Sequence, residues 1–258
     1  MSTTVPPASE TIPTGARAER ASRSERHKEV REKVRAESVR EIPKWYSPFG
    51  HLLATTGVGA ATMAFALSRL TKPSWVELVA VPAASFVVAN AFEWRVHKKL
   101  LHKRTWPFEE LFDRHTPVHH VVFVEDDMSI RESKEMRLVL IPAIGVLGAV
   151  IASAPGAALA GALFGKNVGL LALATSGAYM VAYELSHLAY HLPEDHPVGG
   201  HPLVRFMRKH HAAHHDPKRM QRENFNVTVP LFDWIMGTMA KDEPAPAEAS
   251  EELASAAE

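Results

Sequence analysis

Long uncharged segments constrain the fold of this chain more than any other feature of its sequence. No Asp, Glu, Lys or Arg occurs in residues 46–68 or 78–92, and Lys166 is the only charged residue in 138–183. A helix needs about 20 mostly apolar residues to cross the hydrocarbon core of a bilayer. The alternative interpretation is that these segments are buried helices of a soluble protein, but uncharged runs of this length are uncommon in soluble cores. The pattern predicts an all-α integral membrane protein. Four transmembrane helices are expected near residues 48–69, 74–94, 137–155 and 167–186.

The connections between these segments predict two helical hairpins. Short connections join the first helix to the second and the third to the fourth, whereas a long polar loop separates the hairpins. The Ala- and Gly-rich segment 155–164 is expected to form a turn or a short helix on the lumenal or periplasmic side. All lysines and arginines except Arg69, Lys72 and Lys166 fall on the opposite side, which the positive-inside rule makes cytoplasmic. Both termini are therefore expected in the cytoplasm, for a protein of the bacterial inner membrane or an ER-type membrane.

The composition divides the chain into three parts. Residues 1–45 form a polar tail without an apolar signal-peptide core, residues 46–240 form the membrane-embedded domain, and residues 241–258 form a disordered acidic tail. Acids and bases alternate at helical spacing in residues 17–40. We interpret this stretch as a solvated helix on the membrane surface or as a docking site for a redox partner.

Ten of the fifteen histidines lie in four tight clusters at or just beyond the ends of the uncharged segments. Neutral imidazole is a common ligand of iron, copper and zinc, and one ion takes only about four to six ligands, so ten histidines indicate two ions. All four clusters fall on the predicted cytoplasmic side. The expected ligands are His97, His102, His115, His119, His120, His187, His191, His211, His214 and His215.

The spacing within the clusters predicts their local structure. His187 and His191 lie on one face of a helix because residues four apart share a face, and the same holds for the cluster that begins at His211. His210 could replace His211, since it lies four residues before His214. The clusters at residues 97–102 and 115–120 contain five-residue spacings, which separate their members on a regular helix. A bend or a loop is expected in each.

Several other oxygen-activating and nucleotide-dependent classes are excluded by what the chain lacks. It contains no cysteine, which removes thiolate-ligated haem, cysteine-held iron–sulfur clusters and zinc fingers. Neither a P-loop nor a dinucleotide fingerprint occurs, and no nucleic-acid partner is expected.

The order of the histidines, HX4H, HX3HH, HX3H and HX2HH, resembles that of the histidine-motif membrane oxygenases of the fatty acid hydroxylase and sterol desaturase superfamily. The resemblance covers roughly residues 85–238 and includes KHHAAHH (209–215) and NFNVTVPLFDWIMGT (224–238). It implies a non-haem di-iron enzyme with two Fe ions that uses dioxygen to hydroxylate a lipid or another long hydrophobic substrate. The second cluster departs from the usual pattern, because three residues instead of two lie between His115 and the pair His119–His120. Which of its histidines bind which ion is therefore left open.

The same resemblance implies how the enzyme would work. No catalytic residue is expected beyond the metal centre, and a separate ferredoxin or cytochrome b5 with its reductase would supply electrons. We expect this donor to dock on a basic surface around Arg205, Arg208, Lys209, Lys218 and Arg219. The alternatives are a desaturase of the same superfamily and a noncatalytic metal-binding or metal-transporting membrane protein.

Four acids flank the histidine clusters and have two interpretations. They could orient the imidazoles through ring N–H bonds, a common role beside metal-bound histidine, or they could be ordinary helix-end acids. These residues are Glu93, Asp113, Glu184 and Asp216.

Overall fold

The computed structural model describes residues 14–241, and their regular structure is helical. Within this range no β-strand forms, and the predicted all-α fold is confirmed. The longer helices are α1 (Thr14–Arg40), α2 (Pro48–Ser68), α3 (Trp75–Val96), α7 (Ala143–Phe164), α8 (Lys166–Tyr190) and α9 (Pro202–His214). The shorter ones are η1 (His97–Leu101), α4 (Glu109–Arg114), η2 (His115–His119), α5 (His120–Val122), η3 (Ser133–Glu135), α6 (Met136–Val139) and α10 (Leu231–Ile235).

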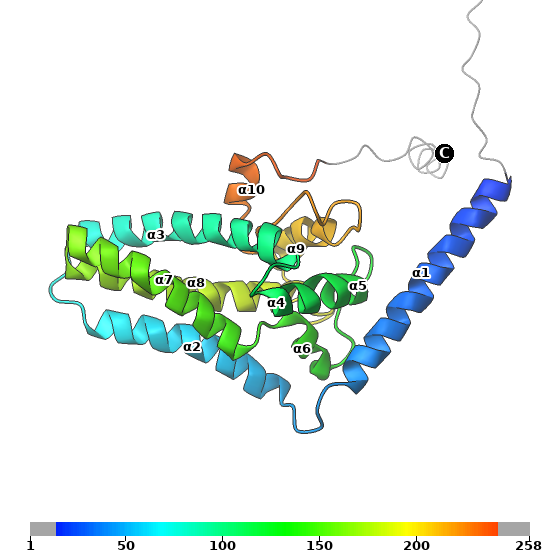
Figure 1. Ribbon diagram of the computed structural model, residues 1–258, viewed down its shortest axis with the longest axis horizontal. Coiled ribbons are helices and arrows are strands. Elements are labelled where there is room, and N and C mark those ends of the chain that lie inside the picture. The colour runs from blue at the N-terminus through cyan, green and yellow to red at the C-terminus, as the bar shows by residue number, and fades with distance from the viewer. Residues whose placement is uncertain (1–13, 242–258) are drawn as a thin grey trace, which may run out of the picture.

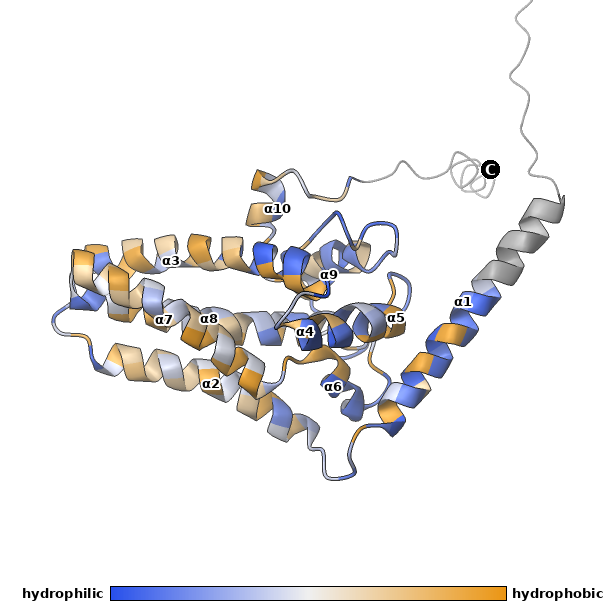
Figure 2. Cartoon of the chain, in the orientation of Figure 1, coloured by the Kyte–Doolittle hydropathy of each residue, from blue (hydrophilic) through white to orange (hydrophobic). Residues whose placement is uncertain are grey.

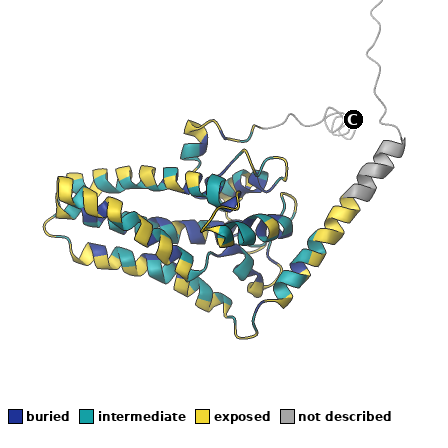
Figure 3. Cartoon of the chain, in the orientation of Figure 1, coloured by how far each residue is buried: buried dark blue, intermediate teal, exposed yellow. Residues whose placement is uncertain are grey.

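Four helices, α2, α3, α7 and α8, lie side by side and are long and apolar enough to cross a membrane (Figure 1). Helix α8 packs against the other three, and its inner face is the most buried. Apolar side chains such as Leu53, Val79 and Ile144 are exposed. Figures 2 and 3 show the outer faces of these helices as largely hydrophobic and exposed. Such faces are stable in lipid, which supports a multi-pass membrane protein.

The starts of α2 and α3 follow capping rules. The Ser47 side chain accepts a hydrogen bond from the Gly50 amide, with a proline in the first turn, and Ser74 forms a capping box with Glu77. Asn167 exchanges hydrogen bonds of 3.0 and 2.9 Å with the backbone of Thr71, so the α2–α3 and α7–α8 connections lie at the same end of the bundle. The side of the membrane that this end faces, and hence the two-hairpin topology, stays a prediction.

The third span differs from the prediction in two ways. It is interrupted near its start, between α6 and α7, because Pro142 disfavours a helical conformation at Ile141, whose N–H instead donates to the Glu184 carboxylate at 3.1 Å. It then continues as one helix through Pro155 to Phe164, so the expected turn or short helix at residues 155–164 is wrong. A proline removes one backbone hydrogen bond but is tolerated within membrane helices.

Helices α2 and α8 approach closely at two glycines. A Cβ atom at Gly59 would lie 2.5 Å from the Gly177 carbonyl oxygen, and one at Gly177 would lie 2.5 Å from the Gly59 carbonyl oxygen. Only glycine allows the two backbones to meet in this way.

Helix α1 covers the residues 17–40 that were predicted to be helical, and its last turns contact the chain around α5. The predicted acidic tail, 241–258, lies outside the described residues apart from Lys241. The boundaries of the three predicted parts stay a prediction.

Candidate metal centre

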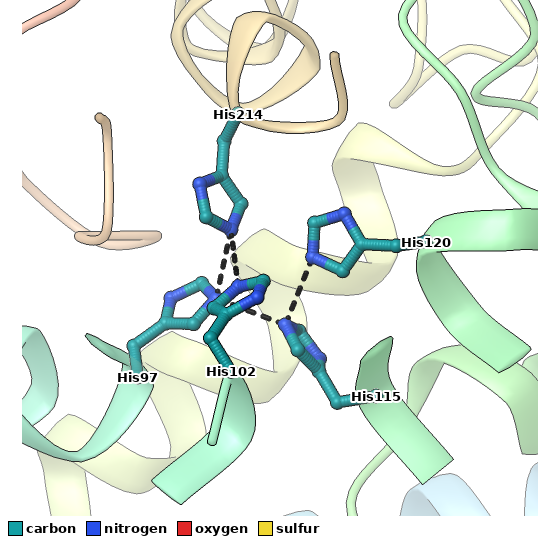
Figure 4. A group of neighbouring side chains, drawn as sticks. All are labelled: His97, His102, His115, His120 and His214. Atoms are coloured by element: carbon teal, nitrogen blue, oxygen red, sulfur yellow. Dashed lines mark hydrogen bonds between the residues drawn. The ribbon is translucent and has the colours of Figure 1, made fainter. Parts of the chain in front are cut away.

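All ten clustered histidines come together at one end of the bundle, and each is at most 8% exposed. They form two groups in which the nearest ring nitrogens lie within 4.8 Å of one another. The first group contains His97, His102, His115, His120 and His214 (Figure 4). The second contains His119, His191, His211 and His215. His187 adjoins the second group, with its Nε2 atom 3.3 Å from that of His119.

Two π-helical turns bring the five-spaced histidines together. The turns η1 and η2 replace the bends or loops expected from the sequence, and their wider coil places residues five apart on one side. The Nε2 atoms of His115 and His120 consequently lie 3.0 Å apart. The extra residue of the second cluster is accommodated within η2. This register assigns His115 and His120 to the first group and His119 to the second.

Regular helical spacing positions the remaining histidines. His211 and His215 are one turn apart on α9 and its end, and their Nε2 atoms lie 3.2 Å from each other. His214 points instead to the first group, with its Nε2 atom 2.9 Å from that of His102. His210 does not replace His211, because its Nε2 atom lies 3.3 Å from the Asp233 carboxylate.

Backbone carbonyls, not acidic side chains, orient five of the ten rings. The Nδ1–H groups of five histidines donate to carbonyl oxygens at 2.5–2.9 Å. The pairs are His97–Phe225, His119–Leu138, His191–Met128, His214–Glu223 and His215–Phe123. A backbone carbonyl has no signature in the sequence, so residue types alone could not reveal these partners.

The interpretation of the four flanking acids as imidazole partners is wrong. Asp113 pairs with Arg104, and Asp216 with Arg219. Glu184 accepts the Ile141 amide, and Glu93 accepts hydrogen bonds from the segment 226–228. In each case the contact joins the carboxylate to a group other than an imidazole ring, and the second oxygen of Glu184 is buried without a hydrogen-bond partner among the described residues.

The facing nitrogens of the first group fit a bound cation. A neutral imidazole has one N–H, and in His97 and His214 that hydrogen is used by a carbonyl, so two Nε2 lone pairs face each other at 3.0 Å. Burial lowers the pKa of His214 well below its usual value, which keeps the ring neutral. Two lone pairs repel at this distance unless a positive ion lies between them. Metal–nitrogen bonds of about 2.1 Å place neighbouring ligand nitrogens roughly 3 Å apart.

The second group has the same character. Burial lowers the pKa of His119 to about 4, and the pKa values of His191, His211 and His215 also fall well below the usual value. These rings are neutral near pH 7 and able to donate their lone pairs to a metal. The donor sets of both groups therefore suit iron, copper or zinc.

The family model for fatty acid hydroxylase matches residues 82–238, which is more than half of the chain and includes all ten histidines. The chain belongs to the fatty acid hydroxylase family. This membership confirms the resemblance to the fatty acid hydroxylase and sterol desaturase superfamily. Comparison with curated proteins and comparison with solved structures each found no match. Helices α1 and α2 lie outside the matched region.

An apolar cavity of about 700 Å³ connects the membrane-spanning part of this fatty acid hydroxylase family member to the first histidine group. Helix α8 packs against α3 and α7, and the cavity separates these two helices. Ala80 and Phe164 line its far end, whereas Glu93, His97 and Tyr179 line the end near the histidines. Alanine and valine dominate the wall between these two ends.

The surface expected to receive an electron donor is less basic than the sequence indicates. Arg205 and Arg208 both pair with Glu194, at 3.0 and 3.4 Å, and Arg208 is buried. Arg219 pairs with an acid as well. Lys209 and Lys218 are exposed. The docking of a donor here stays a prediction.

Proposed function

We propose that this chain is a membrane-bound non-haem di-iron oxygenase that hydroxylates a lipid or another long hydrophobic substrate with dioxygen and external electrons. Its family supports an oxidoreductase, and the two histidine groups could hold metal ions. The observation that carries the proposal is the apolar cavity, because it runs between membrane-spanning helices and ends at His97.

The ten histidines would hold two ions. The group around His97 and His214 would bind one, and the group around His191 and His215, with His187, would bind the other. When bound, ferrous ions would supply electrons that activate dioxygen for attack on an unactivated C–H bond. The protein contributes rings that carbonyl hydrogen bonds hold in place, and a site that is closed to bulk water.

The cavity would bind and orient the substrate. Each buried methylene group contributes about 0.8 kcal/mol, so an alkyl chain gains affinity along the whole apolar wall. Because α3 and α7 are separated along the cavity, a chain could enter between them directly from the bilayer. The carbon nearest His97 would be the one attacked.

The reaction requires an electron donor from outside the chain. Hydroxylation inserts one oxygen atom of dioxygen into the C–H bond, and the other leaves as water after taking up two electrons and two protons. A ferredoxin or cytochrome b5 type of protein with its reductase would deliver those electrons on the cytoplasmic side.

Reconstitution under isotopically labelled dioxygen tests the proposal. We expect label in one hydroxyl group of the product, only when a reductase system is present, and no product from the His191→Ala variant. Product formed without dioxygen, or with its oxygen derived from water, would contradict the proposal. An oxygen-dependent double bond without label would instead assign the chain to the desaturases of its superfamily.

A further inference from the structure

Different irregular segments orient the two histidine groups. In the first group, His97 and His214 donate to the carbonyls of Phe225 and Glu223, which lie in the segment 223–228. In the second group, rings donate to carbonyls in the segment 123–128. Neither segment is a helix, apart from single turns and bends, so other contacts must hold each carbonyl in place.

Glu93 fixes the first of these segments. It is buried on α3, one turn before His97. One carboxylate oxygen accepts the amides of Val227 and Thr228 at 2.5 and 3.2 Å, and the other accepts the Thr228 hydroxyl at 2.7 Å and the Asn226 side-chain amide at 3.2 Å. The Tyr179 hydroxyl also donates to it. The segment is thereby attached to the end of α3, which continues directly into η1 and His97.

Arg35 fixes the second segment and its continuation to residue 135. It lies on α1, is 3% exposed, and donates to the Ser129 carbonyl at 2.8 Å. Its guanidinium forms ion pairs with Glu135 at 3.1 Å and with Asp127 at 3.6 Å. It also lies 5.3 Å from the centre of the Phe123 ring, whose residue supplies the carbonyl for His215.

We propose that Glu93 and Arg35 are positioning residues for different metal ions. Glu93 holds the carbonyls that orient the first group, and Arg35 holds those that orient the second. The inference rests on the proposed function in requiring two bound ions. It also gives α1, which lies outside the family region 82–238, a role in the metal centre.

The chemistry of each side chain explains why substitution would affect one group. Glu93 accepts hydrogen bonds from five donors, and a glutamine would bring an N–H₂ group against some of them. Arg35 presents several N–H groups in a fixed planar fork, which lysine replaces with a single point charge. Removing either side chain leaves its buried polar partners without a hydrogen-bond or ion-pair partner. The segment should then shift, and its carbonyls should lose their hydrogen bonds to the imidazole rings.

The test is the iron content of the purified full-length protein in detergent after loading with ferrous iron. The variants are Glu93→Gln and Arg35→Met, and Glu194→Gln and Arg205→Met serve as exposed controls. We expect each of the first two to lose about half of the bound iron, while the controls keep all of it.

A second substitution identifies the ion that remains. With His214→Ala, which weakens the first group, Glu93→Gln should cause little further loss, whereas Arg35→Met should remove most of the remaining iron. With His191→Ala, which weakens the second group, the pattern should reverse. The Mössbauer spectrum of the wild type should contain two iron signals. Glu93→Gln and Arg35→Met alone should each retain one of them, and the retained signal should differ between the two variants.

Milder variants separate positioning from loss of folding. Arg35→Lys and Thr228→Val should keep the elution profile of the wild type in size-exclusion chromatography and lose iron partly, each from its own group. Equal loss of both signals in every variant, or full retention in Glu93→Gln and Arg35→Met, would overturn the inference. Wild-type protein that binds no iron would instead overturn the proposed function.

Discussion

Filling the cavity at Gly156 should reduce the binding of long alkyl chains selectively. Gly156 lines the cavity on α7, and a Cβ atom there would meet no heavy atom within 4 Å, so Gly156→Phe can enter the cavity without disturbing the backbone. Phe164, at the far end, lies eight positions further along the helix. At 1.5 Å per residue, the phenyl ring would close off about 12 Å of the cavity.

The magnitude follows from the methylene groups that this part of the cavity would no longer bury. A ligand with four methylene groups beyond residue 156 should lose about 3 kcal/mol at 0.8 kcal/mol each, which corresponds to a roughly 200-fold loss of affinity, and longer chains should lose more. Chains too short to pass residue 156 should lose little. The assay is the displacement of a fluorescent fatty acid from purified protein by saturated fatty acids of increasing length.

Gly148→Phe is the matched control, because Gly148 lies on the same helix, has equally open surroundings and does not line the cavity. The affinity of Gly148→Phe for saturated fatty acids should equal that of the wild type at every chain length. Equal losses for short and long chains in Gly156→Phe, or the same profile in both variants, would refute the assignment of the cavity as the chain-binding site.

Three further predictions concern the π-turn, the helix packing and the topology. Deleting Pro117 shortens the five-residue turn and rotates the histidines after it away from His115, so iron content should fall below that of the wild type; unchanged content would contradict the role of the turn. Gly177→Ala should lower the free energy of unfolding by about 1–3 kcal/mol through overpacking against Gly59, measured by denaturation in mild detergent, whereas Gly57→Ala, with open surroundings, should not. A reporter fused after residue 125 should be cytoplasmic, and a signal from the opposite side would contradict both the four-span topology and a shared metal site.

The sequence predicts the spans well because their signal is local. An uncharged run of sufficient length has few stable conformations other than a membrane helix, and α2, α3 and α8 begin and end within about four residues of the expected bounds. The interruption before α7 and the helix through Pro155 were not predicted. Proline breaks helices in water, whereas lipid penalises unpaired backbone groups so strongly that the helix continues.

The sequence identified the ten histidines that the structure brings together, but not the geometry in which they meet; their role as ligands stays a prediction. His187 and His191 have the spacing of a regular helix, whereas a five-residue spacing is compatible with a loop, a bend or a π-turn. The division into two groups depends on the η2 register. Contacts through the backbone, such as that between Glu93 and the Val227 amide, depend on tertiary packing and leave no pattern in the sequence. In the sequence, Arg35 is one of many charged residues between residues 17 and 40, and nothing distinguishes it from the others.

Anomalous scattering at the iron edge, from crystals of the iron-loaded protein, tests the central claim most directly. The account predicts two iron positions in each chain. One should lie among His97, His102, His115, His120 and His214, and the other among His119, His191, His211 and His215. A single iron position, or iron bound away from these histidines, would contradict it.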